Sequence, residues 1–314
     1  MNIKQIASAT LLGAAVLMAL PLATPPALAL SESLEEFVGP EPPLFDTPEA
    51  ALEAFKTTLA KGDLAEIAAL LGLDAEKLKS AEGIGERIEE LRTATAQLAS
   101  IKGSENQRII SVGREVWPFP FPLVKSDKDG KWAFDTVAGV EEIVNRRIGE
   151  NELQAIETVR LYVEAQRDYA MEDRDLDGVL EYAQKLISTE GQTDGLYWPP
   201  EQGDGESPMG ESINQAALEK AAAGQGYFGY RFRILPRQGS NIAGGAYDYV
   251  INGNMIGGFA LVGWPVDYAR TGVSTFVISH AGIAYEKDLG PETEELVKAI
   301  DSFDPDGSWE VIPD

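Results

Sequence analysis

The hydrophobic pattern of the second half of the chain changes period once, and this change constrains the fold more than any other feature. Apolar residues recur every three or four positions from Leu153 to Val163, which predicts a one-sided helix over about 150–171, after a break at Gly149. From residue 227 onward apolar and polar residues alternate, which predicts consecutive strands at 227–235, 246–252, 258–265, 273–279 and 283–287. The apolar face of such a helix must be buried against another element of the fold. We therefore expect residues 141–314 to form a domain in which the long helix packs on an antiparallel meander.

Shorter helices complete this second half. They are expected over 182–187, 213–223 and 291–300, the last of them because it begins with a proline followed by acidic residues.

The first half combines short helices with a small sheet. Thr47, Pro48 and Glu49 are a helix-start signal, because threonine caps, proline suits the first helical position and glutamate favours the positive helix end. Helices are expected from Pro48 to about Gly62, over 64–71 and over 84–101, and strands over 108–112, 116–124 and 131–135. Residues 46–140 should thus form a small α+β domain, and the whole chain is assigned to the α+β class.

The N-terminus carries the pattern of a secretory signal peptide. Lys4 precedes an apolar run over 6–20, and Ala27-Leu28-Ala29 is a small-x-small cleavage site. The run is shorter than the roughly 20 residues that a membrane span needs. We therefore expect residues 1–29 to be removed, leaving a mature chain of 285 residues (314 minus 29) without a membrane span, in the periplasm or secreted. Residues 30–45, rich in proline and acid, are expected to be a flexible leader.

Composition excludes several classes of function. The chain has 51 acidic and 26 basic residues and a net charge of −25, so nucleic acid and anionic lipid surfaces should repel it, while cations should be concentrated around it. It has no cysteine, which excludes disulfides, thiol catalysis and a cysteine-linked lipid anchor. The single histidine, His280, is expected in a hairpin turn and excludes a multi-histidine zinc site.

The segment Asp173 to Glu181 is the strongest candidate for a site. Asp173, Asp175 and Asp177 alternate before Gly178, which matches the first, third, fifth and sixth positions of an EF-hand loop. The remaining expected metal ligands are the carbonyl of Val179, at the seventh position, and the side chain of Glu181, at the ninth. The twelfth position is Gln184 and not the usual bidentate glutamate. We predict a structural Ca²⁺ in the loop 173–184; the alternative is a solvated acidic turn that caps a helix.

Combined motifs resemble a known family over nearly the whole mature chain. The motifs are DRDLDGVLEYA at 173–183, DGLYWP at 194–199 and KDLGP at 287–291. They resemble a family of exported bacterial proteins described as a domain of unknown function, DUF2950. The resemblance implies an exported protein and supplies no activity.

Two further resemblances concern the folds of the halves. TPEAALEAF at 47–55 followed by KGD at 61–63 resembles the nuclear-transport-factor-2-like superfamily, which implies a cone-shaped α+β domain. The segments 258–265 and 275–278 are similar to the sheet of pilin and pseudopilin head groups, some of which hold calcium. Pilins, however, begin with an almost wholly apolar helix, whereas the helix from residue 150 is amphipathic and another domain precedes it.

These observations favour a non-enzymatic binding or assembly protein of the bacterial cell envelope, stabilised by calcium. The expected partner is an envelope protein or a glycan. The alternative is an envelope glycan hydrolase that uses paired carboxylates. For that alternative the pair to test is Asp194 with Glu201, beside Tyr197 and Trp198.

Overall fold

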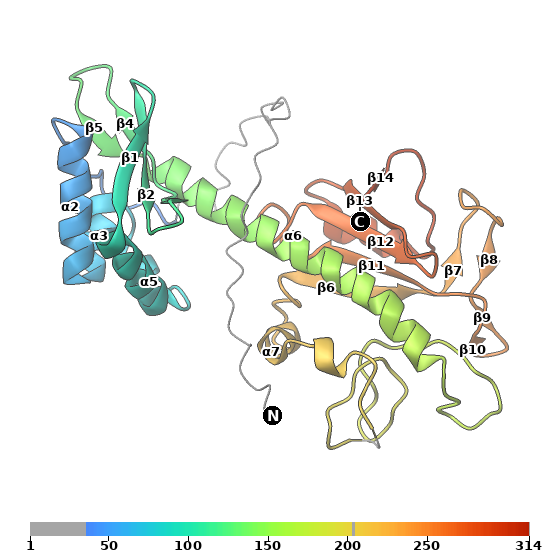
Figure 1. Cartoon of the computed structure of the whole chain (residues 1–314). Helices are drawn as coiled ribbons and strands as arrows, with labels where there is room; N and C mark the ends of the chain where they lie inside the picture. The colour runs from blue at the N-terminus through green and yellow to red at the C-terminus, as the bar shows by residue number, and fades with distance from the viewer. Residues whose placement is uncertain (1–35, 203–204, 314) are drawn as a thin grey trace.

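A computed structural model describes residues 36–202 and 205–313 of the chain, and Figure 1 shows its two parts joined by one long helix. The expected signal peptide, residues 1–29, lies outside the described residues. None of the helices in the described ranges is both long and apolar enough to cross a membrane.

The N-terminal part begins with helices whose ends follow from capping chemistry. Thr47 caps α2 (Pro48–Lys61) by accepting a hydrogen bond from the N–H of Ala50 at 3.1 Å, and Gly62 ends this helix with a φ of 71°. Asp63 caps α3 (Leu64–Leu71) in the same way. The short helix α4 (Ala75–Ser80), which the hydrophobic pattern did not predict, leads to α5 (Ile84–Gln97).

The N-terminal sheet is antiparallel, with the order β1-β2-β4-β5 and with β3 paired to β2. Its strands are β1 (Ala99–Gly103), β2 (Gln107–Val112), β3 (Trp117–Pro118), β4 (Leu123–Lys125) and β5 (Trp132–Phe134). The predicted helix over 84–101 is wrong in its last turn, because residues 99–103 pair with β2 and bring Ile101 opposite the buried Ile110. The predicted strand over 116–124 is divided into β3 and β4. Between them Phe119 and Phe121 enter a buried aromatic cluster with Phe55 of α2.

One continuous helix, α6 (Thr136–Tyr169), links the two parts. The break expected at Gly149 is therefore wrong. A glycine inside a helix costs only about 1 kcal/mol relative to alanine, and burial fixes the helix on both sides of it: Val144 packs in the N-terminal core and Ala155 in the C-terminal core. The domain boundary expected between residues 140 and 141 thus lies within α6.

The C-terminal part is built on an antiparallel sheet with the order β14-β13-β12-β11-β6. Its strands are β6 (Tyr230–Leu235), β11 (Ala260–Pro265), β12 (Ser274–Ser279), β13 (Ala284–Asp288) and β14 (Glu310–Val311). Helix α6 contacts β11, β12 and β13, as predicted for its apolar face. The buried hydroxyl of Tyr162 donates to the carbonyl of Ala260 at 3.2 Å, and one carboxylate oxygen of Glu152 accepts from the N–H groups of Val273 and Ser274.

The chain between β6 and β11 leaves this sheet, which corrects the predicted run of consecutive strands. The predicted strand 246–252 forms two small hairpins outside the sheet. In one, β7 (Arg237–Gln238) pairs with β8 (Tyr247–Asp248), and in the other β9 (Val250–Ile251) pairs with β10 (Asn254–Met255). The turn of the second hairpin has positive φ at Asn252 and Gly253, which suits a tight two-residue connection.

The remaining helices are short. They are the 3₁₀ turn η1 (Gly210–Ser212), α7 (Gln215–Ala222), α8 (Thr293–Leu296) and the 3₁₀ turn η2 (Val297–Ala299). The helix predicted over 182–187 is wrong, because none of these residues is helical. The N–H of Tyr182 donates to the carbonyl of Met255, and the carbonyls of Lys185 and Leu186 accept from the N–H groups of residues 196 and 197. Backbone groups used in these long-range bonds cannot form an i to i+4 ladder.

Residues 36–45, expected to be flexible, are bonded to the N-terminal part. Gly39 donates to the carbonyl of Gly72 at 2.8 Å, and Phe45 exchanges both backbone hydrogen bonds with Trp132. Each part has its own buried core and combines helices with an antiparallel sheet, with runs of helices and runs of strands largely separate along the chain, which confirms the α+β class.

Candidate metal centre

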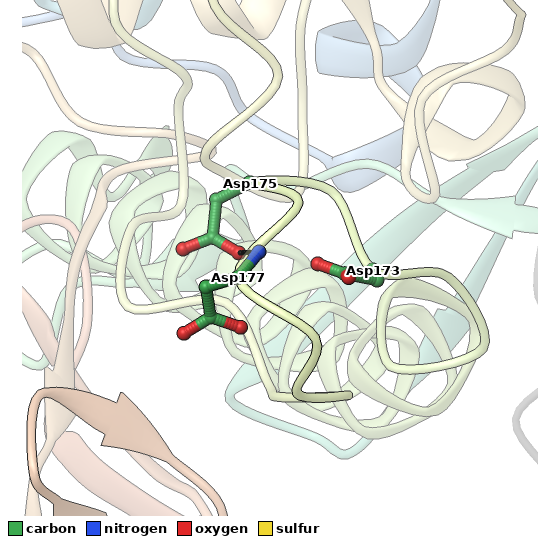
Figure 2. A group of neighbouring side chains, drawn as sticks. All are labelled: Asp173, Asp175 and Asp177. Carbon is green, nitrogen blue, oxygen red and sulfur yellow. Dashed lines mark hydrogen bonds between the residues drawn. The ribbon is translucent and has the colours of Figure 1, made fainter.

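Three aspartates converge in the loop that follows α6. Asp173, Asp175 and Asp177 each offer a carboxylate oxygen, and these atoms lie within 4.8 Å of one another. Figure 2 shows the carboxylates of Asp175 and Asp177 side by side, with that of Asp173 facing them. The three aspartates that the alternating spacing assigned to the metal site therefore lie close together.

The backbone of the loop is arranged around these carboxylates. Asp173 accepts a hydrogen bond from the N–H of Gly178 at 2.9 Å, and Asp177 accepts one from the N–H of Val179 at 2.8 Å. Gly178 has a φ of 90°, a conformation that glycine adopts without strain, and Leu176 has a φ of 62° although it carries a side chain. A non-glycine residue in this region costs of order 1–2 kcal/mol. The loop holds this conformation while leaving the Leu176 side chain 87% exposed.

One buried carboxylate oxygen of the triad has no hydrogen-bond partner within the protein. The Oδ1 atom of Asp173 is buried and makes no hydrogen bond, whereas its Oδ2 atom is used by Gly178. A buried acceptor that is left unpaired costs free energy. This oxygen lies in the group of residues that could hold a cation, which would satisfy it.

The β9–β10 hairpin packs on the loop and uses the side chains that the sequence assigned to the metal. The side chain of Asn254 donates to Oδ2 of Asp177 at 2.7 Å, and Oε2 of Glu181 accepts from the N–H of Met255 at 2.9 Å. The side chain of Gln184 donates to the carbonyl of Gly253 at 2.7 Å. Glu181 is therefore not brought into the aspartate group, and one of its oxygens anchors the hairpin instead.

Val179 stands between the triad and Glu181. Its side chain is partly buried, and its N–H is the donor to Asp177. The carbonyl ligand predicted at this position stays a prediction.

A buried glutamine closes the base of the loop, and sequence reasoning missed it. Gln166 is 0% exposed; its amide nitrogen donates to the Tyr162 hydroxyl at 3.0 Å and to the Ala183 carbonyl at 2.8 Å, and its amide oxygen accepts from the Ala183 N–H at 2.7 Å. These bonds join α6 to the chain on the far side of the aspartates. The available signal was a polar residue three positions after Val163, on the apolar stripe of the helix.

Arg174, between the first two aspartates, turns away from them. Its guanidinium lies over the rings of Tyr169, at 5.0 Å, and Trp198, at 5.2 Å, and pairs with Glu172 at 3.2 Å. Burial, followed by the negative charge of Glu181, raises the pKa of Tyr169 to about 12, so this phenol stays neutral beside the loop. Because Arg174 pairs with Glu172 and lies over these two rings, its positive charge does not pair with the aspartate triad.

The carboxylate pair proposed for glycan hydrolysis has a different setting. Asp194 accepts hydrogen bonds from the Lys185 ammonium and from the N–H and hydroxyl of Thr189. Burial alone would raise the pKa of Asp194, but these bonds outweigh it and hold the pKa below its usual value. Such a carboxylate is ionised near neutral pH and cannot serve as the proton donor that glycoside hydrolysis needs.

The aromatic residues beside this pair do not form a sugar platform. Trp198 is 1% exposed and Tyr197 is 6% exposed, so both belong to the core. His280 lies in the turn after β12, with its ring 5.7 Å from that of Tyr249.

Comparison with protein-family models decides the family of this chain. The model described as "Protein of unknown function (DUF2950)" matches residues 43–312. The chain belongs to the DUF2950 family. The match covers both parts, including the aspartate loop, which confirms the family resemblance noted in the sequence. No curated protein and no solved structure matched the chain, so the resemblances of its two halves to nuclear-transport-factor-2-like and pilin-like domains stay predictions.

Proposed function

We propose that this DUF2950 protein is an exported, non-enzymatic binding or assembly protein of the bacterial cell envelope whose C-terminal part is stabilised by Ca²⁺. The metal proposal is carried by the convergence of Asp173, Asp175 and Asp177, together with the buried and unpaired Oδ1 of Asp173. The signal-peptide pattern over residues 1–29 supports export.

The chemistry of the donor set favours calcium. Hard cations prefer carboxylate oxygens, and Ca²⁺ accepts irregular geometry with six to eight ligands, whereas Mg²⁺ demands a near-ideal octahedron and keeps several waters. The triad supplies oxygens from three side chains of one loop, and the charge of −25 on the chain concentrates cations nearby. Glu181 would enter the site only through a water molecule or through its second oxygen, since Oε2 is bonded to Met255.

The position of the loop supports a structural role for the ion. The loop connects the end of α6 to the segment that Gln166 and the β9–β10 hairpin hold in place. An ion that fixes the loop would therefore stabilise the hairpin and the end of the helix together. The hydrolase alternative is weaker, because Asp194 is committed to Lys185 and Thr189.

The binding proposal is tested by affinity capture. The mature protein is immobilised and exposed to envelope extracts in calcium or in a chelator, next to Asp173→Asn and the matched control Asp127→Asn, which lies in the turn after β4. We expect a discrete partner that is retained in calcium by the wild type and the control and lost in chelator and by Asp173→Asn. Capture that is identical in all samples would contradict the calcium-dependent proposal, and turnover in a glycan screen that Asp194→Asn abolishes would support the hydrolase instead.

A further inference from the structure

The tip of the β9–β10 hairpin places an asparagine directly before a glycine. Asn252 is the one asparagine of the chain that a glycine follows. Asn252 and Gly253 form the turn between the two strands, and both are exposed. The space around the Cα of Gly253 is open, because a Cβ placed there would meet nothing within 4 Å. Water therefore reaches both residues freely.

The two groups that could react with each other in this turn are both unbonded. Within residues 36–202 and 205–313, the Asn252 side chain makes no hydrogen bond, and the main-chain N–H of Gly253 is not donated to another group. The side chains of Asn151, Asn214 and Asn254 are in contrast held by hydrogen bonds. A free side-chain amide next to a free main-chain nitrogen supplies the electrophile and the nucleophile of succinimide formation.

We propose that Asn252 is a site of spontaneous deamidation. The main-chain nitrogen of Gly253 attacks the side-chain carbonyl carbon of Asn252 and gives up its proton. A C–N bond forms and ammonia leaves, which produces a succinimide ring. Water then adds to either ring carbonyl and the C–N bond at that carbon breaks, giving aspartate or isoaspartate without any oxidation or reduction. Glycine favours the attack because no side chain shields its nitrogen.

The contacts between the hairpin and the aspartate loop should set the rate of this reaction. Positive φ angles at Asn252 and Gly253 keep the turn tight, and the side chain of Gln184 holds the carbonyl of Gly253 at 2.7 Å. Ring closure requires the Gly253 nitrogen to turn toward the side chain of Asn252, so the reaction proceeds from local openings of the turn. Each bond that closes the hairpin onto the loop therefore slows the deamidation.

The isoaspartyl product would loosen the hairpin. It adds one carbon to the main chain of the turn, so a two-residue connection no longer matches the register in which Ile251 faces Asn254. Asn254 and Met255 are the hairpin residues that bond to Asp177 and Glu181. Deamidation at the tip would thus release the hairpin from the aspartate loop. This inference goes beyond the proposed binding role and does not depend on calcium.

The test is mass spectrometry of the folded protein, aged in chelator at mildly alkaline pH below its unfolding midpoint and then cleaved into peptides. We expect the peptide that carries Asn252 to gain the mass difference between an amide and a carboxylic acid, and to contain isoaspartate. Asn145 is an internal control, because it is exposed but lies within α6, where the next main-chain N–H is held in the helix. Its peptide should keep its mass. Calcium is absent from this assay, so a negative result would leave the metal proposal standing.

Three variants separate a specific reaction from general ageing. Asn252→Gly removes the side-chain amide, keeps a residue that accepts positive φ, and should abolish the mass gain. Gln184→Ala removes the bond to the Gly253 carbonyl and should speed the mass gain about two- to tenfold, the effect of losing one hydrogen bond. Gln225→Ala, an exposed residue before β6, should leave the rate unchanged. No mass gain at Asn252 in the wild type, or an equal gain at Asn145, would overturn the proposal, and equal rates in the two glutamine variants would overturn control by the loop.

Discussion

Replacement of Gln166 by leucine tests how the aspartate loop is closed. The side chain is fully buried and makes both backbone hydrogen bonds of Ala183, which is itself 1% exposed. Leucine has a similar volume and leaves no large cavity, but it can neither donate nor accept. Two buried backbone groups would then be unpaired, at about 1–3 kcal/mol each, so we expect Gln166→Leu to lower the free energy of unfolding by about 2–6 kcal/mol.

The assay is thermal unfolding followed by circular dichroism, beside Gln154→Leu as a matched control on the same helix. For a part of this size each kcal/mol shifts the midpoint by about 2–4 °C, so a mid-range loss of about 4 kcal/mol corresponds to roughly 8–16 °C. The side chain of Gln154 is only partly buried, and its replacement should change stability by no more than about 0.5 kcal/mol. Equal midpoints for the two variants would refute the idea that Gln166 clamps the loop.

Three further predictions follow from particular contacts. Gly139→Ala should destabilise the protein by about 1–3 kcal/mol, because its new methyl group would lie 2.0 Å from the buried ring of Phe121. Gly149→Ala, in the same helix, meets nothing within 4 Å and should stabilise the protein by about 0.5–1 kcal/mol. Denaturant midpoints compare the two variants. Asp175→Asn should raise the unfolding midpoint in chelator, because repulsion between carboxylates at 4.8 Å is about 1 kcal/mol per pair in water. The same variant should lower the midpoint in calcium. A change of the same sign in both buffers would contradict a metal site at the triad. Folding lowers the pKa of Asp194, so the ionised carboxylate stabilises the fold above the pKa of the unfolded carboxyl, and this stabilisation is lost as pH falls through the folded pKa. In melting curves at a series of pH values, Asp194→Asn should differ most from the wild type near neutral pH and converge with it in acid.

The sequence predicted local features whose chemistry is contained in a few neighbouring residues. The cap at Thr47, the stop at Gly62, the alternation in the main strands and the convergence of the three aspartates all follow from short-range spacing. The aspartates could be placed together because a loop with that spacing and a glycine turns its own side chains inward.

Features that depend on distant partners could not be predicted in this way. Gly149 stays helical because two separate cores hold the helix on either side of it. Residues 99–103 form a strand and do not extend the helix, because all five pair with residues of β2 in an antiparallel ladder. Glu181 matched a ligand position by spacing, yet Met255, 74 residues away, takes one of its oxygens.

A structural Ca²⁺ in the aspartate loop is best tested by the unfolding midpoint of the wild-type protein, measured in calcium and in a chelator. Calcium at 100 times its dissociation constant would add about 2.7 kcal/mol to the free energy of unfolding. We predict a clear rise of the midpoint in calcium that Asp173→Asn abolishes. Indistinguishable midpoints in calcium and in chelator would contradict the claim.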